Sequence, residues 1–376
     1  MRLSRIGASK TAAIVIVVVV IVAAIAGLAA YMSTVPPAPT TTTPTTTATT
    51  PTETAPTATT AAPGKITLAL FISNLGNPYF VMMKDGAVKA IEELKSKGVN
   101  IELKVYDAKD DPSLQVNQIE TAVSEGVDAI LVNPVHKEAI QPALEKAKDR
   151  GIPVVTTDRD VANPELRLVF IGTDNVKGGE LAAKALIKAL EESGKSKPWK
   201  IVILHGIPGT TAAEDRKKGF HNVLDSYIEK GDIEVVAEEI ANFRRDEALS
   251  KMESLLAKTK DVDAVICAND EMALGAIQAI EGAGLTPGKD IIVVGYDAIP
   301  DAVKAVKEGK MYATMAQSPF LQGYWAVYAA YYHIVKDWKP SADFIPTPLV
   351  VVTSENADTF QEETAKPQPL PGAPSE

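Results

Sequence analysis

The sequence has few of the residues that metal enzymes and disulfide-stabilised proteins need. Its 376 residues include one cysteine, Cys267, which excludes an internal disulfide and any multi-cysteine zinc or iron–sulfur site. The four histidines, His136, His205, His221 and His333, never stand at the i,i+4 spacing of a helical metal motif. The motifs Gly-x-Ser-x-Gly and His-Glu-x-x-His are also missing. We therefore predict no catalytic residue, no metal and no cofactor.

The chain also has fewer basic than acidic residues. The chain has 38 Lys+Arg against 48 Asp+Glu, a formal net charge of −10, whereas a sequence-independent grip on nucleic acid needs a basic face. We therefore predict no nucleic-acid partner. Hydrophobic residues at 46% and charged residues at 23% are typical of a largely globular chain, and its length predicts more than one folded part.

One long apolar run is present, in residues 12–32. Its 21 uncharged residues would form a helix about 31 Å long, which matches a hydrocarbon core of about 30 Å. Three basic residues precede the run and the next one is Lys65, so residues 1–11 are predicted to be cytoplasmic and the remainder extracytoplasmic. Small residues end the run, so a cleaved signal sequence is the alternative to a transmembrane anchor. Both interpretations export the rest of the chain.

Two segments have compositions that favour disorder. Residues 33–64 are almost all Thr, Pro and Ala, with 14 threonines between Thr40 and Thr60, and are predicted to form an extended, disordered stalk. The proline-containing tail, residues 356–376, is also predicted to be disordered.

Between these segments, apolar runs alternate with amphipathic ones. Runs that are apolar on both faces, separated by helices, predict an α/β fold with parallel sheets covered on both sides. About 290 residues would fill two doubly wound lobes, and the related strings at 127–130 and 262–265 suggest a repeated lobe. The predicted strands are 65–72, 101–106, 127–132, 152–157, 199–204, 262–267 and 291–295, and the predicted helices are 81–97, 113–124, 138–150, 178–192, 213–230, 246–258 and 271–283.

Polar and aromatic residues follow the ends of these strands, where ligands of such sheets bind. Two carboxylates can accept hydrogen bonds from hydroxyls, two guanidiniums can donate them, three amides can do both, and four aromatic rings can cover C–H faces. This combination is what a small polyhydroxylated molecule requires. Taken singly, residues 77–80 also fit an ordinary turn and Asp158–Arg159 a surface ion pair. The residues are Asp158, Asp297, Arg159, Arg216, Asn77, Asn269, Gln317, Tyr79, Phe80, Phe243 and Tyr296.

Residues 65–353 resemble the ribose-binding branch of the type I periplasmic sugar-binding proteins. Seven short sequence motifs are shared with that branch and occur in the same order. The motifs are Asn77–Phe80, Thr157–Arg159, Thr173–Val176, Gly206–Arg216, Asn269–Gly275, Val294–Asp297 and Ala313–Gln317.

The resemblance implies a set of sugar-binding residues. They are Ser73, Asn77, Tyr79, Phe80, Asp158, Arg159, Arg216, Phe243, Asn269, Tyr296, Asp297 and Gln317. The polar members match the family in residue type. Tyr79 and Tyr296 depart from it, because ribose binders usually carry Phe there, and each adds a hydroxyl that can hold water or change the preferred sugar.

The resemblance also implies an architecture and partners. Residues 65–173 plus 318–347 would form an N-lobe and residues 174–317 plus 348–355 a C-lobe, joined by a three-crossing hinge that closes on the sugar. The chain would be a monomer that delivers a monosaccharide, D-ribose or a similar pentose, to an ABC transporter. Its permease and ATPase would be separate chains, because this chain has no Walker A motif and no second long apolar run.

The sequence leaves three alternatives to a role in transport. Asp158 and Asp297 could serve as the carboxylates of a glycosidase, but Arg159 beside Asp158 should lower a pKa that a general acid needs raised. A repressor of the lac type would carry a helix-turn-helix where this chain has an apolar run and a stalk. A receptor for a furanose-like signal, or for allose or a ketose, coupled to a sensor would use the same closure. The sequence does not identify the sugar.

Overall fold

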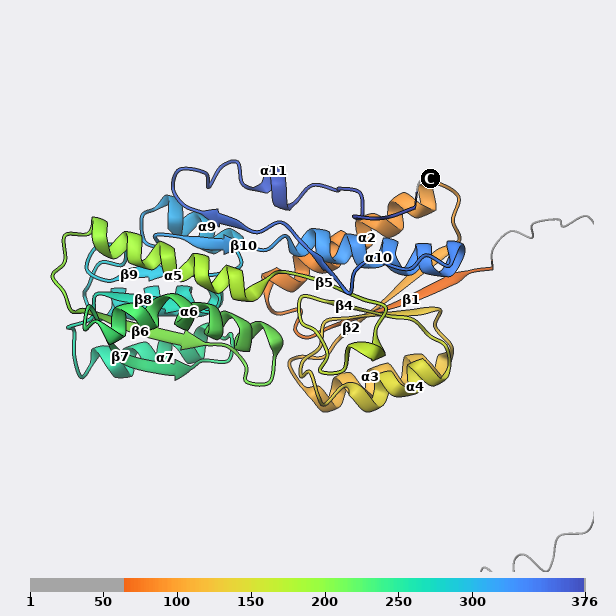
Figure 1. Cartoon of the computed structure of the whole chain (residues 1–376), viewed down its shortest axis with the longest axis horizontal. Helices are drawn as coiled ribbons and strands as arrows, with labels where there is room; N and C mark the ends of the chain where they lie inside the picture. Colours follow the sequence, from red (N-terminus) through yellow and green to blue (C-terminus); the bar gives the residue numbers. More distant parts are fainter. Residues whose placement is uncertain (1–63, 375–376) are drawn as a thin grey trace, which may run out of the picture. The chain divides into compact units, whose positions relative to one another are not determined.

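The computed structural model describes residues 64–374 (Figure 1). The predicted cytoplasmic segment 1–11 and the predicted membrane span 12–32 lie outside the described residues, as does the predicted stalk apart from Gly64. Among residues 64–374, no helix combines the length and apolar character that crossing a bilayer would require.

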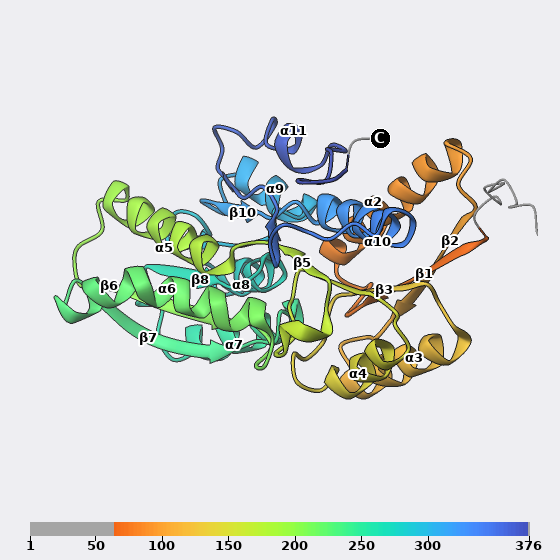
Figure 2. The same ribbon diagram turned by 45° about the vertical axis from the view of Figure 1, so that its right-hand side comes forward.

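The first sheet has six strands in the order β11-β5-β4-β3-β1-β2, and all its pairs are parallel. Side chains alternate between its faces: Leu68, Leu70 and Ile72 of β1 join one core cluster, and Ala69 and Phe71 join another. Helices α2 and α10 lie on one side of the sheet and α3 and α4 on the other (Figures 1 and 2). Burial on both faces explains the unbroken apolar runs. The strands are β1 (Ile66–Ile72), β2 (Ile101–Asp107), β3 (Ala129–Val132), β4 (Val154–Thr157), β5 (Val169–Gly172) and β11 (Phe344–Pro346); the helices are α2 (Pro78–Ser96), α3 (Pro112–Glu125), α4 (Gln141–Asp149), the short η1 (Pro164–Leu166) and α10 (Pro319–Lys336).

The second sheet has four parallel strands in the order β7-β6-β8-β9. A short antiparallel pair, β10 with β12, adjoins it through bridges at Val294–Ala313 and Asp297–Ala316. Helix α5 packs with α6, and α7 packs with α8. The elements are β6 (Trp199–His205), β7 (Ile233–Ile240), β8 (Ala264–Cys267), β9 (Ile292–Val294), β10 (Thr314–Ala316), β12 (Val350–Val352), α5 (Asn175–Glu192), α6 (Thr211–Glu229), α7 (Arg245–Leu256), α8 (Asp270–Gly282) and α9 (Pro300–Lys307).

The predicted α/β fold with parallel sheets is confirmed, and all seven predicted strands and seven predicted helices have counterparts. The structure adds elements that the periodicity did not indicate. Most side chains of α10 are buried, so the helix has no polar face to reveal its period. Strands β10, β11 and β12 are only three residues long. Strand β7 is an edge strand whose last three residues, Glu238–Ile240, are exposed and largely acidic.

Polar caps explain why some helices begin before their apolar pattern does. Asn77 precedes Pro78, and its side chain accepts a hydrogen bond of 2.9 Å from the Tyr79 backbone N–H. Asn269 caps α8 in the same way through the Met272 N–H, at 3.0 Å. Both asparagines are predicted ligand residues, so each also orients the helix that follows its strand.

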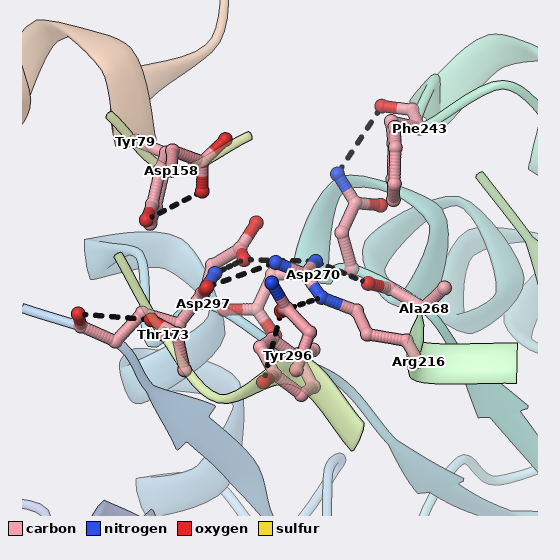
Figure 3. Close-up of polar contacts among 12 residues, drawn as sticks. Tyr79, Asp158, Thr173, Arg216, Phe243, Ala268, Asp270, Tyr296 and Asp297 are labelled. Carbon is pink, nitrogen blue, oxygen red and sulfur yellow. Dashed lines mark hydrogen bonds and ion pairs between the residues drawn. The ribbon is translucent and has the colours of Figure 1, made fainter. Parts of the chain in front are cut away.

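Three chain segments pass between the sheets, at residues 172–175, 316–319 and 346–350. The segments are hydrogen-bonded to one another: Thr347 Oγ1 donates to the Gln317 carbonyl at 2.9 Å, and Ser318 Oγ donates to the Pro348 carbonyl at 2.9 Å. Thr173, drawn in Figure 3, adds a longer bond of 3.4 Å to the same Gln317 carbonyl. These are the places where the resemblance puts the hinge crossings. The lobe boundaries and the hinge motion remain predictions.

The C-terminal tail differs from its predicted disorder. Residues 356–374 begin beside α9, where Asp358 pairs with Lys307, and continue along α10. They include the short helix α11 (Gln361–Thr364), and Phe360 and Leu370 are buried. The indole N–H groups of Trp325 and Trp338 donate to the carbonyls of Gln368 and Gly372, each at 2.9 Å. Composition alone does not predict this packing, because the tail is held by Trp325 and Trp338, which lie on α10 and just after it, far earlier in the chain.

Removing residues 366–376 should therefore destabilise the protein. Burial of one leucine is worth about 1.5–3 kcal/mol, and the cut would also expose Trp325 and leave two indole N–H groups without their acceptors. We expect a lower melting temperature with unchanged ligand affinity, measured by calorimetry. Glu362→Ala, an exposed change in the same segment, is the control. An unaltered melting temperature after the deletion would show that the tail contributes nothing.

Candidate ligand-binding site

A cavity of about 290 Å³ lies at the carboxyl ends of strands from both sheets. Its size is at the lower end of the range for ligand pockets, which fits a small molecule. Nine of the twelve predicted site residues line it: Asn77, Tyr79, Phe80, Asp158, Arg159, Arg216, Phe243, Asn269 and Asp297. The structure thus brings together residues that are up to 220 positions apart in the sequence.

The other three predicted residues do not line the cavity. Gln317 and Tyr296 lie against Arg216, and Ser73 is buried with no hydrogen-bond partner for its Oγ among the described residues. Lining residues that the sequence analysis did not select include Asp110, Arg244, Arg245, Asp246 and Glu271. They stand within a few residues of a strand end or of Phe243, so a wider search after each strand would have found them.

Arg216 is the most connected side chain of the site (Figure 3). From α6 its guanidinium donates to Asn175 Oδ1 at 2.8 Å, to the Ala268 carbonyl at 2.7 Å and to Gln317 Oε1 at 2.9 Å. Its Nη1 also lies 3.5 Å from Asp297 Oδ1. The guanidinium carbon stands 3.9 Å from the Tyr296 ring centroid. These contacts hold a buried cation in one orientation beside the cavity.

Arg159 is held differently. Its guanidinium carbon lies 5.4 Å from the ring centroids of both Phe80 and Phe243, which come from helix α2 and from the loop after β7. Burial lowers the pKa of Arg159, and the negative charge of Asp158 offsets part of that effect. The Nε lies 3.6 Å from Asp158 Oδ2, too far for a hydrogen bond, and has no other partner among the described residues. An unpaired buried donor costs roughly 1–3 kcal/mol, which a ligand oxygen would recover.

The two carboxylates are also held by neighbours. Asp158 accepts from the Tyr79 hydroxyl at 2.9 Å and from Asn133 Nδ2 at 3.0 Å. Asp297 accepts from the Gln317 side-chain amide. Burial raises the pKa of the Asp297 carboxyl well above its usual value, with Arg216 opposing the rise and the charges of Asp270 and Asp158 adding to it. A further donor that approaches from the cavity would therefore favour the ionised form of Asp297.

The hydroxyls of the two tyrosines that depart from the family pattern are bonded to protein groups. Besides its bond to Asp158, the Tyr79 hydroxyl lies 3.2 Å from Gln322 Oε1. The Tyr296 hydroxyl donates to Asn175 Oδ1 at 3.3 Å, on the same oxygen that Arg216 uses. Gly178 gives this hydroxyl its room, since a Cβ there would lie 1.8 Å from it. The Tyr79 hydroxyl therefore orients Asp158 directly, and the Tyr296 hydroxyl holds Asn175, which in turn holds Arg216.

Tyr79→Phe should lower the stability of the unliganded protein. The change removes a hydrogen bond to a buried carboxylate, worth about 1.5–3 kcal/mol, and leaves Asp158 Oδ1 with one donor fewer. A lower denaturation midpoint is the expected result. Tyr331→Phe on α10 is the control, because Tyr331 is half-buried and its hydroxyl makes no hydrogen bond among residues 64–374. Equal midpoints for both variants would contradict the role assigned to this hydroxyl.

Buried carboxylates and guanidiniums, together with side-chain amides and two phenyl rings, line one cavity at the carboxyl ends of two parallel sheets, and they define a binding protein for a small polar molecule. Residues 68–337 match the periplasmic binding protein domain, and the chain belongs to that family. The family is one of transport binding proteins and not of enzymes, which confirms the prediction that the chain is not an enzyme.

Individual relatives agree with this assignment. The chain is 40% identical over 266 residues to the ribose import binding protein of Bacillus subtilis, covering 71% of this chain and 81% of the relative. It is 39% identical over 287 residues to the ribose import binding protein of Haemophilus influenzae, covering 76% and 91%. A periplasmic solute-binding protein of an ABC transporter from Actinobacillus succinogenes, solved with D-allose, superposes with a TM-score of 0.69 at 34% identity, covering 79% of this chain and all of that one.

Proposed function

We propose that this chain is an extracytoplasmic receptor that captures a monosaccharide, D-ribose or a similar pentose, and delivers it to an ABC transporter made of separate chains. The observation that carries the proposal is the cavity between the two sheets, in which nine of the twelve predicted sugar-binding residues meet. The names of the relatives support the same ligand class and the same transport system.

Each part of the cavity would then have a task. Asp158 and Asp297 would accept hydrogen bonds from sugar hydroxyls, and Arg159 and Arg216 would donate to sugar oxygens. The rings of Phe80 and Phe243 would cover the C–H faces of the sugar. Tyr296 and Gln317 would act from behind the cavity wall by holding its charged groups.

Capture would proceed by closure of two lobes about the three crossing segments. The sugar would favour the closed state by contacting both lobes at once, and the shift is limited by its preference for that state. The closed form would present the transporter with a surface that the open form lacks. The mutual hydrogen bonds of Thr347, Gln317, Ser318 and Pro348 would keep the crossings aligned during the motion.

The N-terminal segments would keep the receptor near its transporter. We propose that residues 12–32 are a membrane anchor and residues 33–64 a stalk, a tether that would raise the receptor's effective concentration at the permease. Sodium carbonate extraction of membranes tests this: an anchored chain stays in the pellet, and a cleaved one does not.

Isothermal titration of D-ribose into the full-length chain in mild detergent tests the ligand. Stoichiometric binding at micromolar affinity or tighter would establish a ribose receptor. D-Allose, a galactofuranoside and myo-inositol should be titrated in parallel, because structural neighbours are named for galactofuranose or were solved with D-allose or myo-inositol. Preference for one of them would replace ribose while keeping the receptor assignment. Binding of none of these polyols would overturn the proposal.

A further inference from the structure

A second cluster of polar side chains lies outside the cavity, on the second sheet. It consists of His205 at the end of β6, His221 on α6 and Glu238 on β7, and we call it the His–His–Glu cluster. One possible ligand atom from each residue lies within 4.8 Å of the others. None of the three residues lines the sugar cavity. The cluster could not be predicted from the sequence, because its residues come from three different elements.

Both imidazoles point at one oxygen. His205 Nε2 lies 2.8 Å and His221 Nε2 3.3 Å from Glu238 Oε1. The ammonium of Lys217 lies 2.6 Å from the same oxygen. Three nitrogen atoms therefore converge on one carboxylate oxygen, which is more than a single hydrogen bond requires. A small cation placed between the two Nε2 atoms and the carboxylate could instead be bound by the lone pairs of these three groups.

The surroundings prepare these side chains for a metal ion. His221 Nδ1 lies 2.8 Å from Asp225 Oδ1, the carboxylate–histidine arrangement that directs the Nε2 lone pair toward a metal. Burial lowers the pKa of the His205 imidazole from its usual value, while the Glu238 carboxylate opposes that shift. Glu238 has its pKa lowered to about 2: burial would raise it, but the hydrogen bonds from Lys217 and the two histidines outweigh that effect.

The three side chains of the His–His–Glu cluster differ in how far they are exposed to solvent. The His205 side chain is 7% exposed, while those of His221 and Glu238 are 27% and 30% exposed. One side is therefore closed by the sheet and the other is open to water. A metal ion could enter from solvent and keep a water molecule as its remaining ligand.

We propose that the His–His–Glu cluster is a zinc site. Two imidazole nitrogens and one carboxylate oxygen are a common zinc ligand set, and a water completes the tetrahedron. Magnesium and calcium prefer all-oxygen sites, so they fit less well. The ion would join α6 to β6 and β7. Because α6 also carries Arg216, zinc would stabilise the helix that presents this guanidinium to the cavity, without contacting the sugar.

The test is titration of ZnCl₂ into the full-length chain after treatment with EDTA, in mild detergent without sugar. We expect saturable binding of one ion, a higher melting temperature in zinc that EDTA reverses, and a visible absorption band of tetrahedral cobalt when Co²⁺ replaces zinc. His221→Ala and Glu238→Gln, both at solvent-accessible positions, should each weaken zinc binding at least about tenfold, and Asp225→Asn should weaken it by about tenfold.

Matched variants separate a metal site from a network of hydrogen bonds. Glu239→Gln makes the same change one residue along β7, where the side chain instead pairs with Lys251, and should leave zinc affinity unchanged. His136→Ala controls for loss of a histidine. Lys217→Met should strengthen zinc binding, because it removes the cation that competes for Glu238. No saturable zinc binding, unchanged affinity in His221→Ala and Glu238→Gln, or weaker binding in Lys217→Met would each overturn the proposal.

Discussion

Arg216→Ala is expected to weaken sugar binding by roughly 100-fold and to lower the stability of the unliganded protein by about 3–5 kcal/mol. The affinity falls because the sugar loses a charge-assisted donor that is already oriented by Asn175, Gln317 and the Ala268 carbonyl. The stability falls because Asp297 would remain buried without its nearby cation. Titration calorimetry and thermal denaturation measure the two effects separately.

Two further variants make the result specific to this guanidinium. Lys218→Ala removes a positive charge from the exposed face of the same helix, two residues away, and should change neither quantity. Arg216→Lys keeps the charge but loses the planar fork, so it should recover stability better than affinity. If Arg216→Ala bound sugar as tightly as the unmodified chain, the cavity would not be the sugar site.

Sugar affinity is expected to fall as the solution is acidified, beginning at a higher pH than for an ordinary aspartate. Burial raises the pKa of Asp297 in the free protein, whereas hydroxyl donors of a bound sugar favour the ionised carboxylate and lower that pKa in the complex. Affinity should therefore be constant above the free protein's pKa and decrease by up to about tenfold per pH unit below it. Titrations across a pH series measure this slope.

Asp297→Asn should bind sugar more weakly and remove the slope in that pH range. The variant also tests whether Asp270 causes the pH dependence instead. Burial raises the pKa of Asp270 to about 7, although the Thr314 hydroxyl and the Ile299 N–H donate hydrogen bonds to it. Asp270 does not line the cavity, and it is retained in Asp297→Asn. A slope that persists in this variant would assign the pH dependence to Asp270 or another group.

The stability of the unliganded protein should respond in the opposite sense. A carboxyl whose pKa is higher in the folded state binds its proton more tightly there, so its contribution to stability is present at low pH and is lost as the pH rises through the folded value. Asp297 and Asp270 both have raised values. The ionised Asp297 that favours sugar binding therefore costs the free protein stability once the pH exceeds its pKa in the folded state.

Local patterns were enough to predict most of the sheet. Strand β1 is buried on both faces, so Leu68–Ile72 reads as a continuous apolar run, and the helices that cover it have regular polar faces. Prediction failed where this contrast disappears. Helix α10 is apolar almost all round because it packs on the sheet, on α2 and on the C-terminal tail. The tail itself has a polar, proline-containing sequence, and its partner surface lies some forty residues earlier in the chain.

For the candidate site, too, the sequence predicted some features and not others. The position of Asp158, Arg159 and Asp297 after their strands was enough to select them, because the carboxyl ends of parallel strands meet at one edge. The direction in which each side chain is held could not be predicted. Tyr79 was expected to offer its ring to the sugar and to add a hydroxyl that holds water or changes the preferred sugar, whereas in the structure this hydroxyl binds Asp158. Asn175 was not selected, although it accepts from both Arg216 and Tyr296.

The sequence by itself determined the α/β alternation, the family resemblance and the residue types of the proposed sugar site, because these depend on local periodicity and on short strings around strand ends. Only the tertiary structure decided which of those residues reach the cavity, how the tail packs, and that His205, His221 and Glu238 meet. Such meetings depend on how separate elements pack, and distances between elements are not encoded in any local stretch of the chain.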